Sequence, residues 1–106
     1  MPTKSFSETI SADLQTDREF RRALLSEAVA CMVSGDLDTG KIVLREYING
    51  TIGFAALVVA LDRSPKSLVR MLSHTGNPQA RNLLEMLAYL QKAEDTTLEI
   101  HARNAA

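Results

Sequence analysis

Residues 53–72 of this 106-residue chain, GFAALVVALDRSPKSLVRML, decide its fold. Their pattern predicts two short helices joined by a tight turn, the first over about 54–61 and the second over about 64–72. Ser64 is a good N-cap, because its hydroxyl can accept a hydrogen bond from a free backbone N–H of the first turn. Pro65 then occupies the first helical position, where no N–H is needed and the fixed φ suits a helix.

The second predicted helix has one apolar side and one basic side. Leu68 and Leu72 lie four residues apart and therefore share one side of the helix. Lys66, Ser67 and Arg70 fall largely on the other side. A short, basic, sharply capped helix that follows a short apolar helix is typical of the helix-turn-helix, a motif with which proteins read DNA.

The predicted turn departs from the usual helix-turn-helix pattern of a glycine followed by a buried apolar residue. Asp62 and Arg63 stand at these two places. Asp tolerates a left-handed backbone better than most residues other than glycine, so the turn can still form. We expect Arg63 to lay its aliphatic stem over the core and to hold its guanidinium outside, where it could contact a phosphate.

Positive charge is concentrated in residues 63–81. This window carries +4 in a chain of net charge −1, so the other residues sum to −5. It holds no Asp or Glu and four basic residues, which are Arg63, Lys66, Arg70 and Arg81. Positive side chains gathered on one face release counterions from DNA when they bind it. The alternative is an ordinary solvated face.

The positions of the polar side chains in this window predict separate roles. Residues near the start of a recognition helix reach base edges, so Lys66, Ser67 and Arg70 are the expected readers. The free N–H groups of the first turn could hold a phosphate. Asn77 and Arg81 would touch the DNA backbone, although Asn77 fits equally well as a simple N-cap. His74 could add a donor, but a histidine at such a place is more often a simple loop residue. The predicted DNA-binding set is Arg63, Ser64, Lys66, Ser67, Arg70, His74, Asn77 and Arg81.

The remaining helices are expected over about 6–14, 17–34, 36–49 and 78–92, from capping-box spacings, glycine stops and apolar stripes. Asn77-Pro78 resembles the cap-then-proline signal of Ser64-Pro65, so the last helix should begin at Pro78. Lys41 should pair with Glu46 on the surface. The chain then divides into an N-terminal arm over 1–15, a helical domain over 16–92 and a tail over 93–106.

The tail contains an alternating segment, TLEIH at 97–101, that could form a short strand. A lone strand is not stable, so this one would need a partner, such as its own copy in a dimer. A frayed tail is the alternative.

Composition favours a single helical domain. The chain is 45% hydrophobic and 24% charged, with 5% aromatic residues and no Trp, so Leu, Val, Ile, Ala and Met must build the core. Its one cysteine, Cys31, allows no intramolecular disulfide and is expected to be a buried structural thiol. Without a signal core or an apolar run of about 20 residues, we expect a cytoplasmic protein that does not enter a membrane.

Constellations that would indicate an enzyme are sparse. His74 and His101 lie far apart, neither belongs to a cluster with metal-ligand spacing, and no Gly-rich phosphate loop is present. Asp36 and Asp38 are close together, but a helix start explains them. We therefore expect no catalysis, no cofactor and no metal.

Three segments together resemble a known family. They are SGDLDTGKIVLREYINGTIGF at 34–54, SPKSLVRML at 64–72 and GNPQARNLLEML at 76–87. They resemble the small bacterial helix-turn-helix transcriptional regulators related to addiction-module antidote proteins, which are HigA-like antitoxins. The likeness covers about residues 20–91, and the GNP after the recognition helix is its most specific part.

The resemblance implies an all-α, λ-repressor-like fold of five or six helices with a helix-turn-helix at about 53–72. It also implies a homodimeric regulator of double-stranded DNA, often encoded beside a RelE-like toxin whose operon it represses. Lys66, Ser67 and Arg70 match the recognition-helix positions, and Asn77 matches the cap of the following helix. The predicted core consists of Phe20, Leu24, Leu44, Ile48, Phe54, Leu57, Leu61, Leu68, Leu72, Leu83 and Leu87.

Two interaction surfaces are left for dimerisation, the helices before residue 49 and the tail after residue 92. The rival interpretation is a protein-interaction module that kept this fold but lost DNA binding. In that case the helices before residue 49 would hold a partner.

Overall fold

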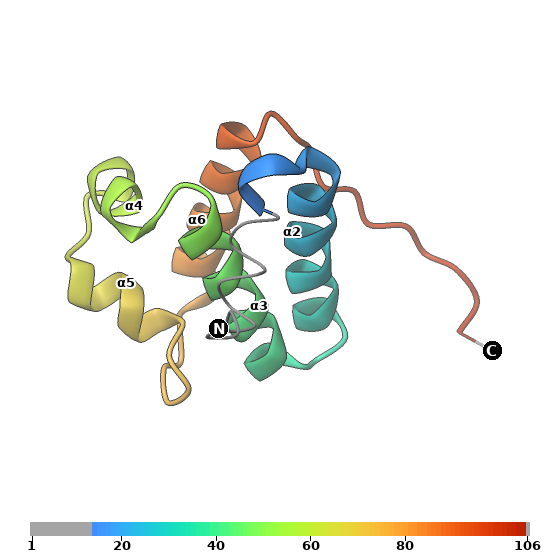
Figure 1. Ribbon diagram of the computed structural model, residues 1–106. Helices are drawn as coiled ribbons and strands as arrows, with labels where there is room; N and C mark the ends of the chain where they lie inside the picture. Colours follow the sequence, from blue (N-terminus) through green and yellow to red (C-terminus); the bar gives the residue numbers. More distant parts are fainter. Residues whose placement is uncertain (1–13, 106) are drawn as a thin grey trace, which may run out of the picture.

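The computed structural model describes residues 14–105 and shows an all-α domain, with no strand among these residues (Figure 1). Its helices are α2 (Arg18–Val33), α3 (Leu37–Gly50), α4 (Phe54–Leu61), α5 (Pro65–Met71) and α6 (Ala80–Ala93). A short helical turn over 14–16 precedes α2. The predicted helix over 6–14 lies, except for its last residue, outside the described residues.

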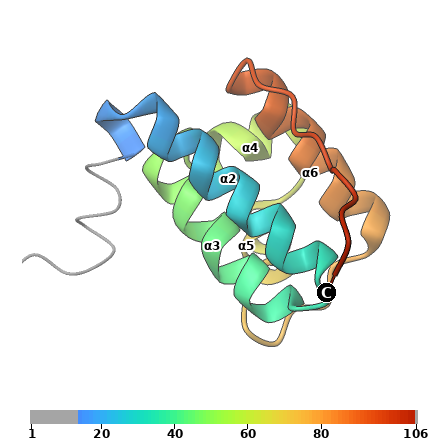
Figure 2. The ribbon, with the colours of Figure 1, turned by 90° about the vertical axis from the view of Figure 1, so that its right-hand side faces the viewer.

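Helices α2 and α3 lie side by side and pack closely against each other (Figure 2). They approach closely at Gly40, where an added Cβ would lie 2.6 Å from Met32 Cγ and 3.0 Å from the carbonyl oxygen of Ala28. The missing side chain therefore permits the close contact between the two helices.

Side-chain caps start both helices within one residue of the predicted positions, although the cap of α2 is Asp17 and not the first residue of the capping-box spacing at 16–19. Asp17 Oδ1 accepts a hydrogen bond of 3.1 Å from the N–H of Phe20, and Asp36 Oδ1 accepts one of 3.2 Å from the N–H of Thr39. The hydrogen bonds from Thr39 also lower the pKa of the Asp36 carboxyl. Between the helices, Gly35 adopts a φ of +98°, a conformation that suits glycine.

The core agrees with the prediction at six positions, Leu44, Ile48, Leu57, Leu68, Leu72 and Leu87. Five predicted members are only partly buried and pack against its edge, namely Phe20, Leu24, Phe54, Leu61 and Leu83. A domain of this size has a large surface for its volume, so many apolar side chains stay half-exposed. The prediction missed seven buried residues, which are Leu14, Leu25, Ala28, Tyr47, Met71, Met86 and Leu90.

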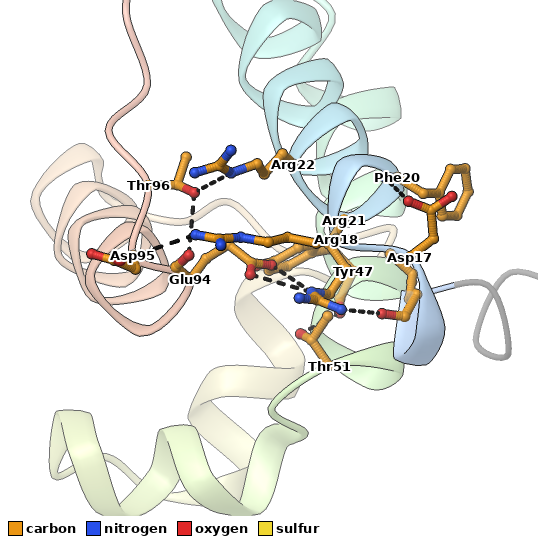
Figure 3. A network of polar contacts seen from close by, with 11 residues as sticks. Asp17, Arg18, Phe20, Arg21, Arg22, Tyr47, Thr51, Glu94, Asp95 and Thr96 are labelled. Carbon is orange, nitrogen blue, oxygen red and sulfur yellow. Dashed lines mark hydrogen bonds and ion pairs between the residues drawn. The ribbon is translucent and has the colours of Figure 1, made fainter.

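A polar cluster joins the C-terminal end of α6 to α2 and α3 (Figure 3). Arg21 Nε donates to Glu94 Oε1 at 2.9 Å, and the Tyr47 hydroxyl donates to the same oxygen at 3.0 Å. A second donor of Arg21 bonds the carbonyl oxygen of Leu14 at 3.1 Å. Arg21 is thus half-buried, because its partners come from outside its own helix. We call Arg21, Tyr47 and Glu94 the clamp.

Two further predictions outside the α4–α5 region, the buried thiol and the start of the last helix, are corrected. Cys31 is only partly buried, and its thiol lies 3.6 Å from Glu27 Oε1. Partial burial and the nearby Glu27 carboxylate raise the pKa of that thiol. Helix α6 begins at Ala80 rather than Pro78, and Gln79 is its N-cap without a side-chain hydrogen bond. Residues 97–105 form no strand within the described chain.

Among the described residues no single helix is long and apolar enough to cross a membrane. Helices α3 and α4 reach that length and composition only as a pair, and they are bent by 98° where they meet.

Candidate nucleic-acid interface

The turn between α4 and α5 forms in the way that the sequence predicts. Asp62 ends α4 in the left-handed conformation, with φ 52° and ψ 50°. The N–H of Arg63 then bonds the carbonyl oxygen of Val58 at 3.3 Å, which closes the end of the helix. The aspartate therefore takes the place at which a glycine is usual.

Helix α5 is capped as expected. Ser64 Oγ accepts a hydrogen bond of 3.1 Å from the N–H of Ser67, and Pro65 is the first helical residue. The cap and the proline both act on the first turn, so residues next to one another in the sequence fix where this seven-residue helix begins. The starting residue in turn fixes the side of the helix on which Lys66 and Ser67 lie.

The two sides of α5 differ as predicted. Leu68 and Met71 are buried against the core, while Lys66 and Arg70 are exposed. Neither basic side chain forms an ion pair with a described residue. The positive side of α5 is therefore free to meet an anionic partner.

Helix α5 and the loop after it enclose a surface hollow of about 760 Å³. Five of the predicted DNA-binding residues line it, namely Ser64, Lys66, Ser67, Arg70 and Asn77. The loop residues Thr75 and Gly76 and the start of α6 complete its wall. The fold thus brings together side chains from two segments that the sequence analysis assigned to base reading and to backbone contact.

The other three predicted residues lie elsewhere. Arg63 Nη2 donates to Asn82 Oδ1 at 2.6 Å and pairs with Glu85 Oε2 at 3.3 Å, so its guanidinium is bound to α6 rather than free for a phosphate. His74 lines a separate hollow of about 70 Å³ beside Asp38. Arg81 is exposed near the start of α6 and does not line the larger hollow.

Asn77 does not cap α6, because the helix starts three residues later. It is an exposed residue of the loop over 73–79. The cap-then-proline signal at 77–78 was misleading, since this part of the chain is held against α5 instead of continuing into a helix. A lysine of α3 holds it there.

Lys41 of α3 fastens this loop, and its predicted place on the surface is wrong. It is 3% exposed, and its ammonium donates to the carbonyl oxygens of Ser73 at 3.0 Å and Gly76 at 2.7 Å. Asp38 Oδ1 lies 3.6 Å from the same nitrogen. The predicted surface pair with Glu46 is therefore wrong, because two backbone carbonyls and a carboxylate satisfy the lysine inside the fold.

The sequence did contain a signal for this buried lysine. Lys41 lies three residues before Leu44 and seven before Ile48, so it belongs to the buried stripe of α3. A lysine on a buried stripe needs acceptors from another part of the chain. Which carbonyls would supply them could not be read from the spacing.

Gly76 permits the loop to lie close to α5. An added Cβ at this position would collide with the backbone carbonyl of Arg70. Lys41 therefore holds the loop in place, and the missing Cβ of Gly76 lets the loop lie against the end of α5. The loop and α5 therefore line the same hollow at a fixed distance from each other.

The described residues contain no group of three His, Cys, Asp or Glu side chains that could hold a metal ion. Hydrogen-bond donors and positive charge, rather than acids and bases in a closed pocket, characterise the α5 face. No protein-family model matches the chain, and no curated protein or solved structure is significantly similar to it.

Proposed function

We propose that this chain is a sequence-specific DNA-binding transcriptional regulator with a λ-repressor-like helix-turn-helix formed by α4 and α5. The observation that carries the proposal is the exposed, unpaired state of Lys66 and Arg70 on a helix whose start is held by Ser64 and Pro65. Such a helix can lie in the major groove, where Lys and Arg donate to guanine.

The hollow beside α5 supports separate tasks for helix and loop. Lys66, Ser67 and Arg70 would face base edges, while Asn77 and the backbone of the loop would meet a phosphate. Arg81 would add a phosphate contact from α6. Arg63 is left out of the proposed interface because Asn82 and Glu85 bind its guanidinium.

A regulator of this kind needs two reading helices on one site, so we propose a homodimer acting on a two-fold symmetric operator. The resemblance of residues 34–54, 64–72 and 76–87 to addiction-module antidote proteins extends this proposal to an autorepressor that neutralises a RelE-like toxin. A gene for a small basic ribonuclease-like protein beside this one, and co-purification of the two products, would support that extension.

A salt-titrated binding assay tests the proposal. Duplexes selected from a random pool, and the region upstream of the protein's own gene, are titrated between about 50 and 200 mM salt. Affinity should fall steeply with salt because each phosphate contact releases counterions. Lys66→Ala and Arg70→Ala should each weaken binding to the selected duplex about tenfold, the lower part of the range for a lost base contact.

Lys92→Ala is the matched control, since Lys92 is exposed in the last turn of α6, away from α5. It removes the same charge and should leave affinity nearly unchanged. If no duplex selects the protein, or if all three variants bind equally well, the DNA-reading proposal fails. The alternative of an interaction module, with a partner held by α2 and α3, would then be preferred.

A further inference from the structure

The segment after α6 is an extended chain whose edges are open. Residues 97–105 form no helix or strand, and the N–H of Leu98 bonds Gln91 Oε1 at 2.9 Å. The backbone groups of 99–105 form no hydrogen bond with any other described residue. An extended segment with free N–H and C=O groups is a template for pairing with another strand.

An apolar groove runs beside this segment. It has a volume of about 430 Å³ and lies between α2 and the tail. Val29, Ala30 and Val33 of the helix and Leu98 and Ile100 of the tail form its apolar lining, and Ser26, Ser34, Glu99 and Arg103 complete it. Two of these side chains are largely exposed, Val33 at 62% and Ile100 at 73%. Apolar side chains left open next to an unpaired strand edge indicate that a further element covers both.

The charges of the tail identify that element. Glu99 and Arg103 lie at equal distances on either side of His101. If two copies of the tail run antiparallel with His101 at the two-fold axis, Glu99 of each chain faces the partner's Arg103. On the other side of the strand Ile100 faces the partner's Ala102. The segment is thus complementary to itself in charge and in apolar character, as an isologous interface requires.

We infer that residues 97–103 form a two-stranded antiparallel pair with the same residues of a second copy, and that this pair covers the groove along α2. The partner is therefore the chain itself. This inference rests on the proposed function only in that a DNA reader requires two copies. The pairing itself is measured without DNA.

The position of the tail agrees with such a dimer. The tail leaves α6 on the side of α2, whereas α4 and α5 form the opposite side of the molecule (Figure 1). Pairing through the tail therefore leaves Lys66 and Arg70 uncovered. The dimer interface and the proposed DNA interface do not compete for the same surface.

A charge-swap experiment tests the pairing. The dimer dissociation constant is measured by sedimentation velocity. Glu99→Arg or Arg103→Glu alone places like charges opposite each other twice and should raise this constant about tenfold or more. The double variant restores opposite charges and should recover most of the loss. Glu19→Arg, exposed on α2, is the matched control and should dimerise like the wild type.

Cysteine cross-linking tests the register independently of the charges. In a Cys31→Ser background, His101→Cys should form a disulfide-linked dimer under mild oxidation, because directly opposite residues bring their Cβ atoms within about 5 Å. Asn104→Cys is the control. It lies three residues from the axis, so the two copies would be about 20 Å apart and should not link.

Three results would overturn the inference: a chain that stays monomeric, a dimer that the single charge reversals leave intact, or equal linking by the two cysteine variants. DNA binding is scored separately. A charge-sensitive tail dimer that binds no duplex would support the pairing and contradict the proposed function. If the tail does not pair but the chain binds a duplex, and Lys66→Ala weakens that binding, the result would support the proposed function and contradict the pairing.

Discussion

The two ends of the molecule use basic side chains in opposite ways. In the clamp, Arg21 of α2 meets Glu94 in an ion pair of 2.9 Å, and these side chains are 23% and 8% exposed. On the α5 face, Lys66 and Arg70 are exposed and form no ion pair with a described residue. Basic side chains therefore stabilise the fold at one end of the molecule and stay available to a partner at the other.

The contrast teaches that positive charge in a sequence does not by itself indicate a binding surface. Residues 18–22 carry three arginines, more than any other run of five residues. Their partners are Asp95, Glu94 and Thr96, which all follow α6 closely or end it. The contrast between cations that hold the fold and cations that stay free can be tested by substitution and by pH.

Glu94→Ala should have the largest effect on stability. It would leave Arg21 and the Tyr47 hydroxyl without their shared acceptor in a partly buried place, and the free energy of unfolding should fall by about 2–3 kcal/mol. Urea denaturation measures this change. Glu85→Ala, which removes the exposed partner of Arg63, should change stability by no more than about 0.5 kcal/mol. Equal losses from both variants would remove the distinction between clamp and surface.

Lys41→Met tests the connection between the fold and the α5 face. The change retains the apolar stem but leaves the carbonyl oxygens of Ser73 and Gly76 without their donor. Stability should fall by about 1–2 kcal/mol, and affinity for a selected duplex should fall about fivefold as the loop moves from α5. Arg45→Met is the control, since among the described residues Arg45 makes only a long contact of 3.5 Å with the Leu72 carbonyl. Unchanged DNA affinity in Lys41→Met would show that the loop does not contribute to binding.

Ser64→Ala removes the side-chain cap of α5. The free energy of unfolding should fall by about 1 kcal/mol, a typical value for a lost N-cap. Ser67→Ala keeps the backbone N–H that Ser64 binds and should change stability by less than about 0.5 kcal/mol. Thermal or urea unfolding followed by circular dichroism distinguishes the two. A larger loss in Ser67→Ala would mean that the cap does not hold the start of the helix.

The smallest expected effect is a loss of the stability contributed by Tyr47 of the clamp at alkaline pH. Burial raises the pKa of Tyr47 well above its usual value of about 10, and the hydrogen bond to Glu94 raises it further. The folded state therefore holds this proton more tightly than the unfolded state. The resulting stability is complete below pH 10 and is lost as the pH rises above it. The difference in unfolding free energy between wild type and Tyr47→Phe should shrink from pH 9 to pH 11, and a constant difference would contradict the burial of this hydroxyl.

Local signals predicted the region of α4 and α5 closely. The bounds of α4, the cap at Ser64, the proline at the first position of α5 and the left-handed Asp62 all agree with the expectation. Each of these depends on residues within four or five positions of one another. The side chains that face the hollow beside α5 could be named for the same reason.

What the sequence by itself determined is therefore the all-α class, the places where most helices begin and end, and the exposed basic side of α5. Only the tertiary structure decided that Lys41 is buried beneath the loop, that Arg63 is bound to α6 and that Arg21 belongs to a clamp. The physical reason is the distance along the chain: Lys41 finds its acceptors 32 and 35 residues away and Arg21 finds Glu94 73 residues away. A charged side chain has its role set by the partner that folding brings to it, and no short-range pattern specifies that partner.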